Sequence, residues 1–309
     1  MIIDVYFLIL PNMMALDIVG PAETLKLAGE QFNIIYVGYN DAERCSTGIL
    51  VGDLKPLPTE IQDGSFIVLS GVSNSLVDFD NPESEMAKKW IIGFKSKVDE
   101  GKISVICICS GALLAGKVGL LDGRNCTTHH EILNRLKTCA PKAFVKDNLL
   151  FVEDRGVYTC AGIMAGIDLA LSLVRVYCGN KTSMKVAREM IVYFPRAGTD
   201  SQNSPWLKFR HHHHPVIHRA QDVIISNLRE KWPLDKLSKE VYVSPRHLSR
   251  LFKQYLNISV KEYQEQMQLI LFDKYIKQEG NLERSSYLSG FSSVRQLRRV
   301  QKKVSVMSS

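Results

Sequence analysis

Continuous apolar runs separated by segments of helical periodicity characterise the larger, N-terminal part of the chain. The apolar runs cover residues 1–10, 32–37, 66–69 and 103–108. Runs of this kind fit strands that are buried on both faces of a parallel sheet. Helices are predicted for residues 21–29, 82–100, 131–138, 165–177 and 184–193, and a hairpin for 149–152 with 157–160. Because strands and helices alternate, the pattern predicts a doubly wound, flavodoxin-like α/β domain with its ligand crevice at the carboxyl ends of the parallel strands.

A different pattern, two short amphipathic helices joined by a tight turn, occupies residues 234–256. The first helix is predicted to end near Tyr242, and its apolar stripe comprises Leu234, Leu237, Val241 and Val243. Ser244 fits the N-cap of the second helix, and Pro245 fits its first turn because the N–H that proline lacks has no partner there. The residues predicted to be buried in the second helix are Leu248, Leu251, Phe252 and Tyr255. The residues left on its outer face are Arg246, Ser249, Arg250 and Lys253.

The outer face of this second helix has the composition of a recognition helix. An α-helix fits the major groove of B-DNA, where an arginine pairs with guanine and a lysine neutralises a phosphate. The alternative is an amphipathic hairpin whose basic face is merely solvated. A second unit of the same pattern begins at Asn281. This repetition favours the first interpretation and predicts an all-α domain with two helix-turn-helix units.

Basic residues are concentrated in the C-terminal part of the chain. The 309 residues carry a formal net charge of +7, and this length favours more than one domain. Residues 206–309 contain 19 Lys and Arg against 9 Asp and Glu, whereas residues 1–205 contain 20 against 23. This asymmetry indicates that only the C-terminal part binds a polyanion such as double-stranded DNA.

Cysteine usage and hydropathy indicate the cellular compartment. The 7 cysteines are odd in number and scattered without a C-x-x-C pair, which argues against a disulfide framework and for a reducing environment. The N-terminus lacks the basic region of a signal peptide, and the most apolar run, residues 103–116, is too short to span a bilayer. We therefore expect a soluble cytoplasmic protein that has no membrane partner.

Residues 196–215 have the polar, Gly- and Pro-containing composition of a linker. The predicted organisation is a first domain of residues 1–195, this linker, and a second domain of residues 216–309. The linker contains four adjacent histidines, His211 to His214. Adjacent histidines bind metal ions weakly, but no spaced cysteine or acidic residue completes a defined site. We expect neither a metal ion nor another cofactor.

Cys109 lies where the strand predicted for residues 103–108 turns into a helix. Such a turn exposes a side chain at the edge of the sheet and directs a helix N-terminus at it, which favours the thiolate. Cys109 is therefore a candidate nucleophile. The alternative is that Cys109 is a small buried hydrophobic residue, the commonest state of a free cysteine.

Five motifs of the N-terminal part resemble those of the class I glutamine amidotransferase-like superfamily, in its ThiJ/PfpI branch. They span residues 16–21, 109–112, 119–124, 127–129 and 161–168. That branch includes isocyanide hydratases, in which a cysteine at the turn is the nucleophile and an acidic residue after the first strand hydrogen-bonds near it. One pocket loop that often reads Gly-Gly is Ser70-Gly71 in this chain. The residues that the resemblance places at a ligand pocket or catalytic site are Asp17, Gly71, Cys109, Ser110 and His129.

The C-terminal part resembles the AraC/XylS family, whose DNA-binding domain contains two helix-turn-helix units joined by a helix. Residues 244–252 match the first recognition helix, residues 261–276 the connecting helix, and residues 290–299 the start of the second recognition helix. The resemblance assigns DNA contact to Arg246, Ser249, Arg250, Lys253, Arg295, Arg298 and Arg299. The two parts, joined by a segment like residues 209–222, together resemble the GlxA family of transcriptional regulators.

Departures from the family pattern lie mainly in the second helix-turn-helix unit. Ser285 and Ser286 stand where the family usually has a buried apolar residue and an alanine, and Gln301 stands where phenylalanine is common. The connecting helix has Met267-Gln268 where an arginine is typical, and the usual Gly-x-Ser-Pro-x-x-Tyr-Arg ending is missing. The core loses apolar area at these positions. We expect a loosely folded second unit that contributes phosphate contacts more than base readout.

Three hypotheses follow. In the first, the protein is a sequence-specific DNA-binding transcriptional regulator whose N-terminal domain senses a small-molecule effector or, as the resemblance implies, forms a homodimer. In the second, it is a cysteine-dependent hydratase or amidase-like enzyme with Cys109 as nucleophile and Asp17 as proton donor or acceptor. In the third, it binds DNA weakly and acts mainly through protein contacts. We favour a regulator without catalysis, because likeness of fold does not transfer activity.

Overall fold

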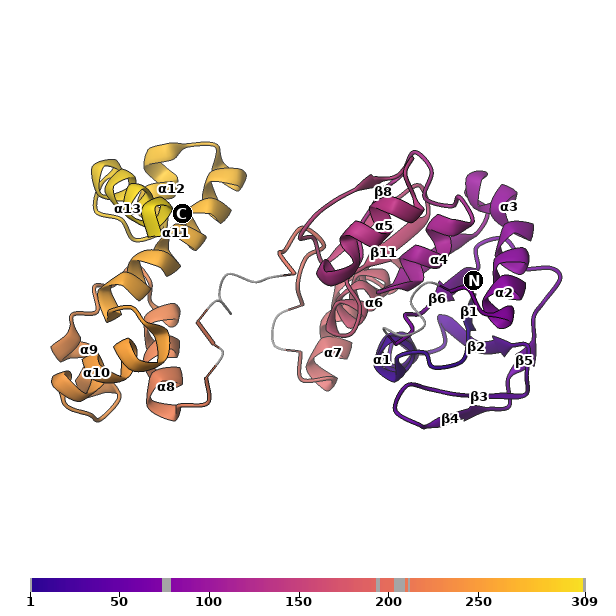
Figure 1. The fold of residues 1–309 in the computed structure, drawn as a ribbon, viewed down its shortest axis with the longest axis horizontal. Coiled ribbons are helices and arrows are strands. Elements are labelled where there is room, and N and C mark those ends of the chain that lie inside the picture. Colours follow the sequence, from indigo (N-terminus) through magenta and orange to yellow (C-terminus); the bar gives the residue numbers. More distant parts are fainter. Residues whose placement is uncertain (1, 74–78, 193–194, 203–208, 211, 308–309) are drawn as a thin grey trace. The chain divides into compact units, whose positions relative to one another are not determined.

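The structure is a computed structural model that describes residues 2–73, 79–192, 195–202, 209–210 and 212–307. The chain divides into two compact units, Met1–Gln202 and Asn203–Ser309. The first unit is built from strands and helices, and the second from helices (Figure 1). Among the described residues, no helix combines the length and the apolar content needed to cross a bilayer.

A central sheet of seven strands, counted over the described residues, organises the first unit. In spatial order the strands are β10 (Phe151–Asp154), β11 (Val157–Cys160), β7 (Ser104–Ile108), β6 (Phe66–Leu69), β1 (Ile3–Leu8), β2 (Phe32–Gly38) and β5 (Lys55–Pro56). Neighbouring strands are parallel except β10, which is antiparallel to β11. Two smaller pairs join β3 (Ala42–Arg44) with β4 (Leu50–Gly52) and β8 (Asn125–Cys126) with β9 (Phe144–Val145). The predicted doubly wound, flavodoxin-like sheet is confirmed.

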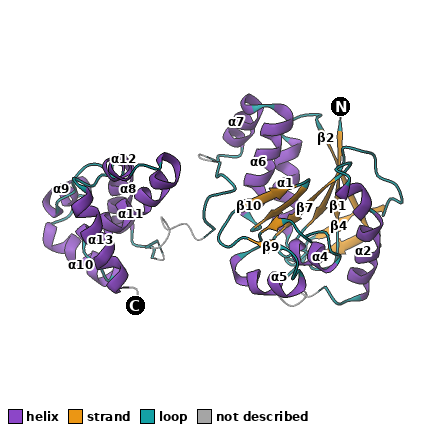
Figure 2. Cartoon of the chain, turned by 90° about the horizontal axis from the view of Figure 1, so that it is seen from above, coloured by secondary structure: helices purple, strands orange, loops and turns teal. Residues whose placement is uncertain are grey.

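Helices cover both faces of this sheet (Figure 2). One face carries α1 (Ala15–Lys26), α6 (Met164–Cys178) and α7 (Asn180–Glu189). The other face carries α2 (Pro82–Gly93), α3 (Lys95–Asp99), α4 (Gly111–Lys117), the short 3₁₀ helix η2 (His130–Ile132) and α5 (Leu133–Cys139). Because both faces are covered, every residue of β6 is buried, which explains why its sequence is a continuous apolar run.

Helix α1 begins at Ala15, earlier than the predicted start at Pro21. Pro21 lies inside the helix, where it has no N–H to donate to the carbonyl oxygen of Asp17. The hydroxyl group of Ser70 donates to that oxygen at 3.4 Å. A contact from the loop after β6 therefore replaces the missing backbone hydrogen bond, and it makes the proline compatible with the helix.

Two other helix boundaries also differ from the prediction. The helix predicted for residues 82–100 is two helices, and they meet at Phe94, whose N–H bonds to the carbonyl oxygen of Ile91 at 3.0 Å. Helix α7 begins at Asn180, before the predicted 184, because Gly179 at φ 85° ends α6 and starts α7 directly. Its predicted end at residue 193 is also wrong, because α7 ends at Glu189 and Ile191 has a left-handed backbone with φ 57°. The predicted hairpin is present as β10 and β11.

The second unit consists of six helices, counted over its described residues. They are α8 (Pro215–Ser226), α9 (Leu234–Glu240), α10 (Pro245–Leu256), α11 (Val260–Glu279), α12 (Leu282–Leu288) and α13 (Val294–Met307). A hydrophobic cluster contributed by α8 to α11 forms the first core, with Phe252 and Tyr263 at its centre. A smaller cluster of Phe272, Phe291, Leu297 and Val300 packs α13 against α11. The predicted helix 245–256 and the predicted connecting helix are confirmed.

The two ends of the predicted linker 196–215 are structured, each within its own unit. Arg196 donates through Nη2 to Asp168 at 2.6 Å, and Gln202 donates to the carbonyl oxygen of Thr128 at 2.7 Å. In the second unit, the ring of Phe209 lies 5.5 Å from that of Tyr263. Residues 203–208 and His211 lie outside the described residues. These contacts at the two ends of the segment could not be predicted from its polar composition.

Candidate functional site

Cys109 occupies the predicted turn between a strand and a helix. Strand β7 ends at Ile108, α4 begins at Gly111, and Cys109 has a left-handed backbone with φ 53°. Two glycines make room for it, because a Cβ atom on Gly162 would lie 2.4 Å from the Cβ of Cys109 and one on Gly71 would lie 2.9 Å from it. The turn at Cys109 therefore depends on the loops after β6 and β11, the strands on either side of β7.

Asp17 is the fully buried carboxylate beside this turn. Its Oδ1 accepts a hydrogen bond from the backbone N–H of Ile163 at 2.6 Å, and its Oδ2 accepts one from Gly71 at 3.3 Å. Burial raises the pKa of Asp17 to about 6, and the two backbone hydrogen bonds oppose that shift. Asp17, Gly71, Cys109 and Ile163 follow β1, β6, β7 and β11, so the structure brings them together at the carboxyl ends of four adjacent strands.

The thiol group of Cys109 is protonated rather than activated. Burial, and after it the negative charge of Asp17, raise the pKa of Cys109 to about 12, against a hydrogen bond from the backbone N–H of Ser110. The pKa is therefore shifted in the direction opposite to the sequence expectation, because burial outweighs the hydrogen bond from the N–H of Ser110 at the start of α4. A raised pKa leaves little thiolate at neutral pH, which makes Cys109 a weak nucleophile in this state.

The other predicted pocket residues support the turn. The Oγ of Ser110 accepts the backbone N–H of Val72 at 2.9 Å, and the hydroxyl of Thr128 donates to the carbonyl oxygen of Cys109 at 2.7 Å. His129 is half-buried with its ring 4.3 Å from that of His130, and burial, then His130, lower its pKa. In the described part of the chain, no hydrogen bond joins His129 to Cys109 or Asp17, and no cluster of residues could hold a metal ion.

The first helix-turn-helix unit consists of α9 and α10. The turn between them contains Tyr242 at φ 56°, and Ser244 caps α10 by accepting the N–H of His247 at 3.2 Å. The buried face of α10 consists of Leu248, Leu251, Phe252 and Leu256. The prediction that Tyr255 is buried is wrong, since it is 44% exposed. Its ring packs instead 4.9 Å from the ring of His214, and Leu256 takes the buried position.

The outer face of α10 is as predicted. Arg246, Ser249, Arg250 and Lys253 are all exposed. Arg250 Nη2 lies 3.1 Å from His247 Nδ1, and Lys253 donates to the carbonyl oxygen of Asn257 at the C-terminal end of the helix. Arg246 and Arg250 are therefore accessible to solvent on a helix whose opposite face is buried in the first core.

The second helix-turn-helix unit, which consists of α12 and α13, repeats this arrangement. Asn281 caps α12 by accepting the N–H of Arg284 at 2.9 Å. The exposed residues of α13 include Arg295, Arg298, Arg299 and Gln301. Ser285 and Ser286 are buried, and neither hydroxyl oxygen has a hydrogen-bond partner among the residues that the structure describes. Both helices are thus formed around a core that carries the two polar positions identified in the sequence.

Gln268 is a residue whose role the sequence analysis missed. It is buried on α11, and its Nε2 donates to the carbonyl oxygens of Leu228 and Gly290 at 2.9 and 3.1 Å. Leu228 lies in the segment between α8 and α9, whereas Gly290 belongs to the turn between α12 and α13, so one amide group joins the segment that leads into the first helix-turn-helix unit to the turn of the second. A polar residue inside the apolar face of the connecting helix was the available signal.

The comparison with protein families matches both parts of the chain. Residues 4–176 match the DJ-1/PfpI family, and residues 224–265 match the bacterial regulatory helix-turn-helix proteins of the AraC family. The first match covers more than half of the chain. The second covers the first helix-turn-helix unit and the start of α11, and α12 and α13 lie outside it.

Curated relatives include both regulators and an enzyme. The chain is 30% identical over 171 residues to the HTH-type transcriptional regulator GbdR of Pseudomonas aeruginosa. These residues are 55% of this chain and 46% of that protein. It is 30% identical over 205 residues to an isonitrile hydratase of Pseudomonas putida, covering 65% of this chain and 83% of the enzyme. It therefore spans about half the length of the curated regulators GbdR and ArgR that it matches.

Solved structures share the fold of the first unit. A ThiJ/PfpI family protein from Pseudomonas syringae is similar with a TM-score of 0.55 and 18% identity, covering 78% of this chain and 89% of that one. An AraC family transcriptional regulator from Pseudomonas putida is similar with a TM-score of 0.51 and 18% identity, covering 61% and 99%. At these identities the likeness shows the fold alone.

Proposed function

We propose that this chain, which belongs to the DJ-1/PfpI family and ends in an AraC-family helix-turn-helix region, is a sequence-specific DNA-binding regulator of transcription. The observation that carries the proposal is the exposed basic face of α10, held by a capped helix and a dense core. The similarity to the regulator GbdR supports it. Such a regulator acts in the cytoplasm, where it has access to DNA.

The proposed DNA contacts divide by chemistry. Arg246 and Arg250 present guanidinium groups that pair bidentately with guanine in the major groove, and Ser249 lies between them. Lys253, at the end of α10, contacts a phosphate, which positions the helix without reading sequence. In the second helix-turn-helix unit the corresponding residues are Arg295, Arg298 and Arg299.

The N-terminal pocket is proposed to sense a small-molecule effector. Asp17, Gly71, Cys109, Ser110 and His129 lie at the turn or next to residues that bond to it. The partly exposed thiol of Cys109 offers a weak donor to a ligand, whereas the fully buried Asp17 holds the turn through its two backbone hydrogen bonds. Binding there requires no chemical step.

A homodimer through the N-terminal unit is also proposed. Leu16 and Val19 of α1 and Met164 at the start of α6 are each more than half exposed, and α1 packs against α6. Exposed apolar side chains on neighbouring helices are typical of protein interaction surfaces. Light scattering of the purified chain tests this, and a monomer at micromolar concentration would contradict it.

A cysteine-dependent hydratase or amidase-like activity is the second candidate function. The observation that favours it is the adjacency of Cys109 and Asp17 at the turn, together with the similarity to an isonitrile hydratase. The raised pKa of Cys109 argues against it, because little thiolate is present at neutral pH. Iodoacetamide labelling discriminates: alkylation of Cys109 faster than that of a free thiol would favour the enzyme.

Binding-site selection from genomic DNA with the full-length chain tests the regulator proposal, and we expect one enriched motif. Replacing Arg250 by alanine should weaken binding to that motif by about 1–3 kcal/mol and relax its preference at one base pair. Lys253→Ala is the matched control, because loss of a phosphate contact weakens all sequences equally. If Arg250→Ala left both affinity and preference unchanged at fixed salt, base reading by Arg250 would be refuted.

A further inference from the structure

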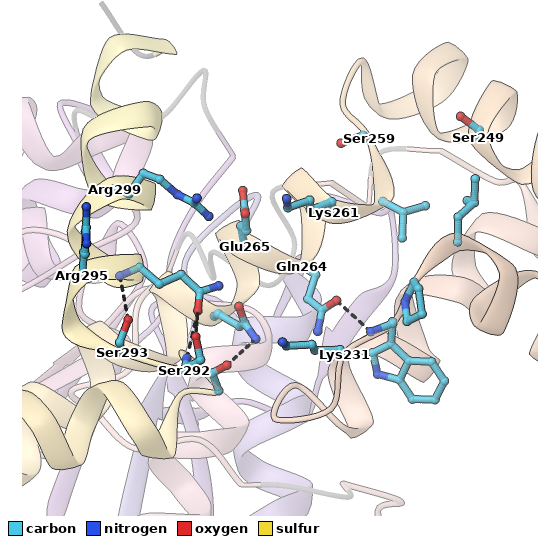
Figure 3. A pocket seen from close by; sticks show the side chains of 17 residues that line it. Lys231, Ser249, Ser259, Lys261, Gln264, Glu265, Ser292, Ser293, Arg295 and Arg299 are labelled. Carbon is cyan, nitrogen blue, oxygen red and sulfur yellow. Dashed lines mark hydrogen bonds between the residues drawn. The ribbon is translucent and has the colours of Figure 1, made fainter.

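A groove of about 1140 Å³ lies between the two helix-turn-helix units of the C-terminal unit (Figure 3). Ser249 of α10 lines one side, and Arg295 and Arg299 of α13 line the other. These are positions proposed to face DNA on the two recognition helices. The groove therefore opens on the face of the unit that presents both recognition helices.

Two lysines lie in the groove between those sides. Lys231 belongs to the segment before α9, and Lys261 to the first turn of α11. Neither they nor Arg295 and Arg299 form an ion pair with any residue that the structure describes. Other cations of this unit that are paired with carboxylates are Arg210, Lys236, Arg284 and Lys303. The positive charge of the groove is thus left uncompensated by the protein.

Acidic groups do not neutralise the groove. Glu265 is the carboxylate among its described lining residues, and its side chain is only 9% exposed and lies 4.0 Å from Lys303 Nζ. Lys303 Nζ is shared with Glu262, which lies closer at 2.9 Å. The groove is therefore lined by one carboxylate against the four cations Lys231, Lys261, Arg295 and Arg299. The N-terminal end of α11, a helix of 20 residues capped by Ser259, also forms part of the wall. Its dipole adds positive potential at the same place.

We propose that this groove holds the phosphodiester backbone of the DNA that lies between the two segments entered by α10 and α13, with Lys231 and Lys261 as its phosphate contacts. Recognition helices in successive major grooves are about 34 Å apart on one face of the duplex, so the minor groove and its flanking phosphates face the protein between them. The inference rests on the proposed function and adds two phosphate-binding residues outside the recognition helices. These contacts position the duplex and carry no sequence information.

Salt-dependent binding of the full-length chain tests the assignment. The variants are Lys231→Ala and Lys261→Ala, with Lys231→Arg and Lys261→Arg as variants that keep the charge. Lys181→Ala, on the exposed surface of α7 in the first unit, is the matched control for loss of one surface lysine. Dissociation constants are measured against salt concentration on the selected motif and on an unrelated duplex of equal length.

Each alanine variant should lower the slope of log affinity against log salt by about 0.9, because one phosphate contact is lost. Between about 50 and 200 mM salt, the wild-type chain should then lose roughly threefold more affinity than each variant. The loss of affinity at low salt should be equal on both duplexes. The arginine variants and Lys181→Ala should keep the wild-type slope, which excludes a general effect on folding.

The possible failures are distinguishable. Wild-type slopes in both alanine variants would overturn the groove assignment, and the regulator proposal would stand if Arg250→Ala still relaxed sequence preference. A loss confined to the selected motif would also overturn it, because the lysines would then read bases. If the wild-type chain enriched no motif, the regulator proposal would fail, and reduced slopes in the lysine variants would still support a phosphate-binding groove.

Discussion

Replacing Ser285 by alanine should stabilise the second helix-turn-helix unit. The side chain is fully buried in α12, and its hydroxyl oxygen has no hydrogen-bond partner in the described residues. Burying a hydroxyl group without a partner costs about 1–3 kcal/mol in proteins. Alanine also has the higher helix propensity, by a few tenths of a kcal/mol. We expect Ser285→Ala to raise the free energy of unfolding of this unit by about 1–3 kcal/mol.

Ser289→Ala is the matched control because it removes the same atom from the same segment. Its hydroxyl is also buried, but it donates to the carbonyl oxygens of Ser285 and Ser286 at 2.7 and 2.9 Å. Losing these bonds should destabilise the unit by about 0.5–1.5 kcal/mol. The two substitutions therefore have opposite predicted signs, and the main difference between them is the hydrogen-bond status of the hydroxyl, since helix propensity adds only a few tenths of a kcal/mol for Ser285 inside α12.

Amide hydrogen exchange in α12 and α13 of the full-length chain is the suitable assay. A chain with two units does not unfold in one two-state transition, whereas exchange reports the opening free energy of each segment. Protection should increase in Ser285→Ala and decrease in Ser289→Ala. A decrease in both would refute the reasoning, since it would show that the Ser285 hydroxyl has a partner that stabilises the folded unit.

Two further predictions concern Gln268 and Asp17. Gln268→Leu removes the N–H donor from the carbonyl oxygens of Leu228 and Gly290. In titrations of this variant, the ratio of the affinity for a site with two half-elements to the affinity for a site with one should be smaller than in the wild-type chain. Gln268→Arg, which keeps N–H donors, should preserve this ratio. Burial raises the pKa of Asp17 from 3.8 to about 6, so the folded state binds this proton more tightly and loses stability as pH rises from about 4 to 6. Asp17 alone should make the first unit about 1 kcal/mol more stable at pH 5 than at pH 7, and denaturant titrations of Asp17→Asn should lack that difference.

Features set by local sequence or by complete burial were predictable. Strands β6 and β7 are covered on both faces, so β6 and the last four residues of β7 are apolar and buried without alternation. Helix α10 has both of its start signals, Ser244 and Pro245, and begins where they indicate. The turn at Cys109 was identified because a buried strand is followed at once by small residues that continue as a helix.

Features set by contacts distant in sequence were not predictable. Pro21 indicates a helix start, but a hydroxyl group from Ser70 satisfies the carbonyl oxygen that the proline leaves free, and the helix begins earlier. The periodicity of α10 placed Tyr255 in the core, whereas a histidine outside the helix gives its ring a partner at the surface. Lys231 and Lys261 line one groove only because α11 packs between the two helix-turn-helix units. The charge asymmetry of the sequence indicated a polyanion without showing where it binds.

The two helix-turn-helix units differ in the size and polarity of their cores. The first has the larger core, and the AraC-family match covers it. The second has a smaller core with two unpartnered hydroxyl groups, yet α13 presents Arg295, Arg298 and Arg299 to the solvent. A segment of low local stability that binds a ligand only when folded is stabilised by that ligand. We therefore expect DNA to increase hydrogen-exchange protection in α12 more than in α10, and high salt to abolish that increase before α10 releases its site. Equal protection of both helices at every salt concentration would show instead that the second unit is as rigid as the first, and that its serines carry no functional consequence.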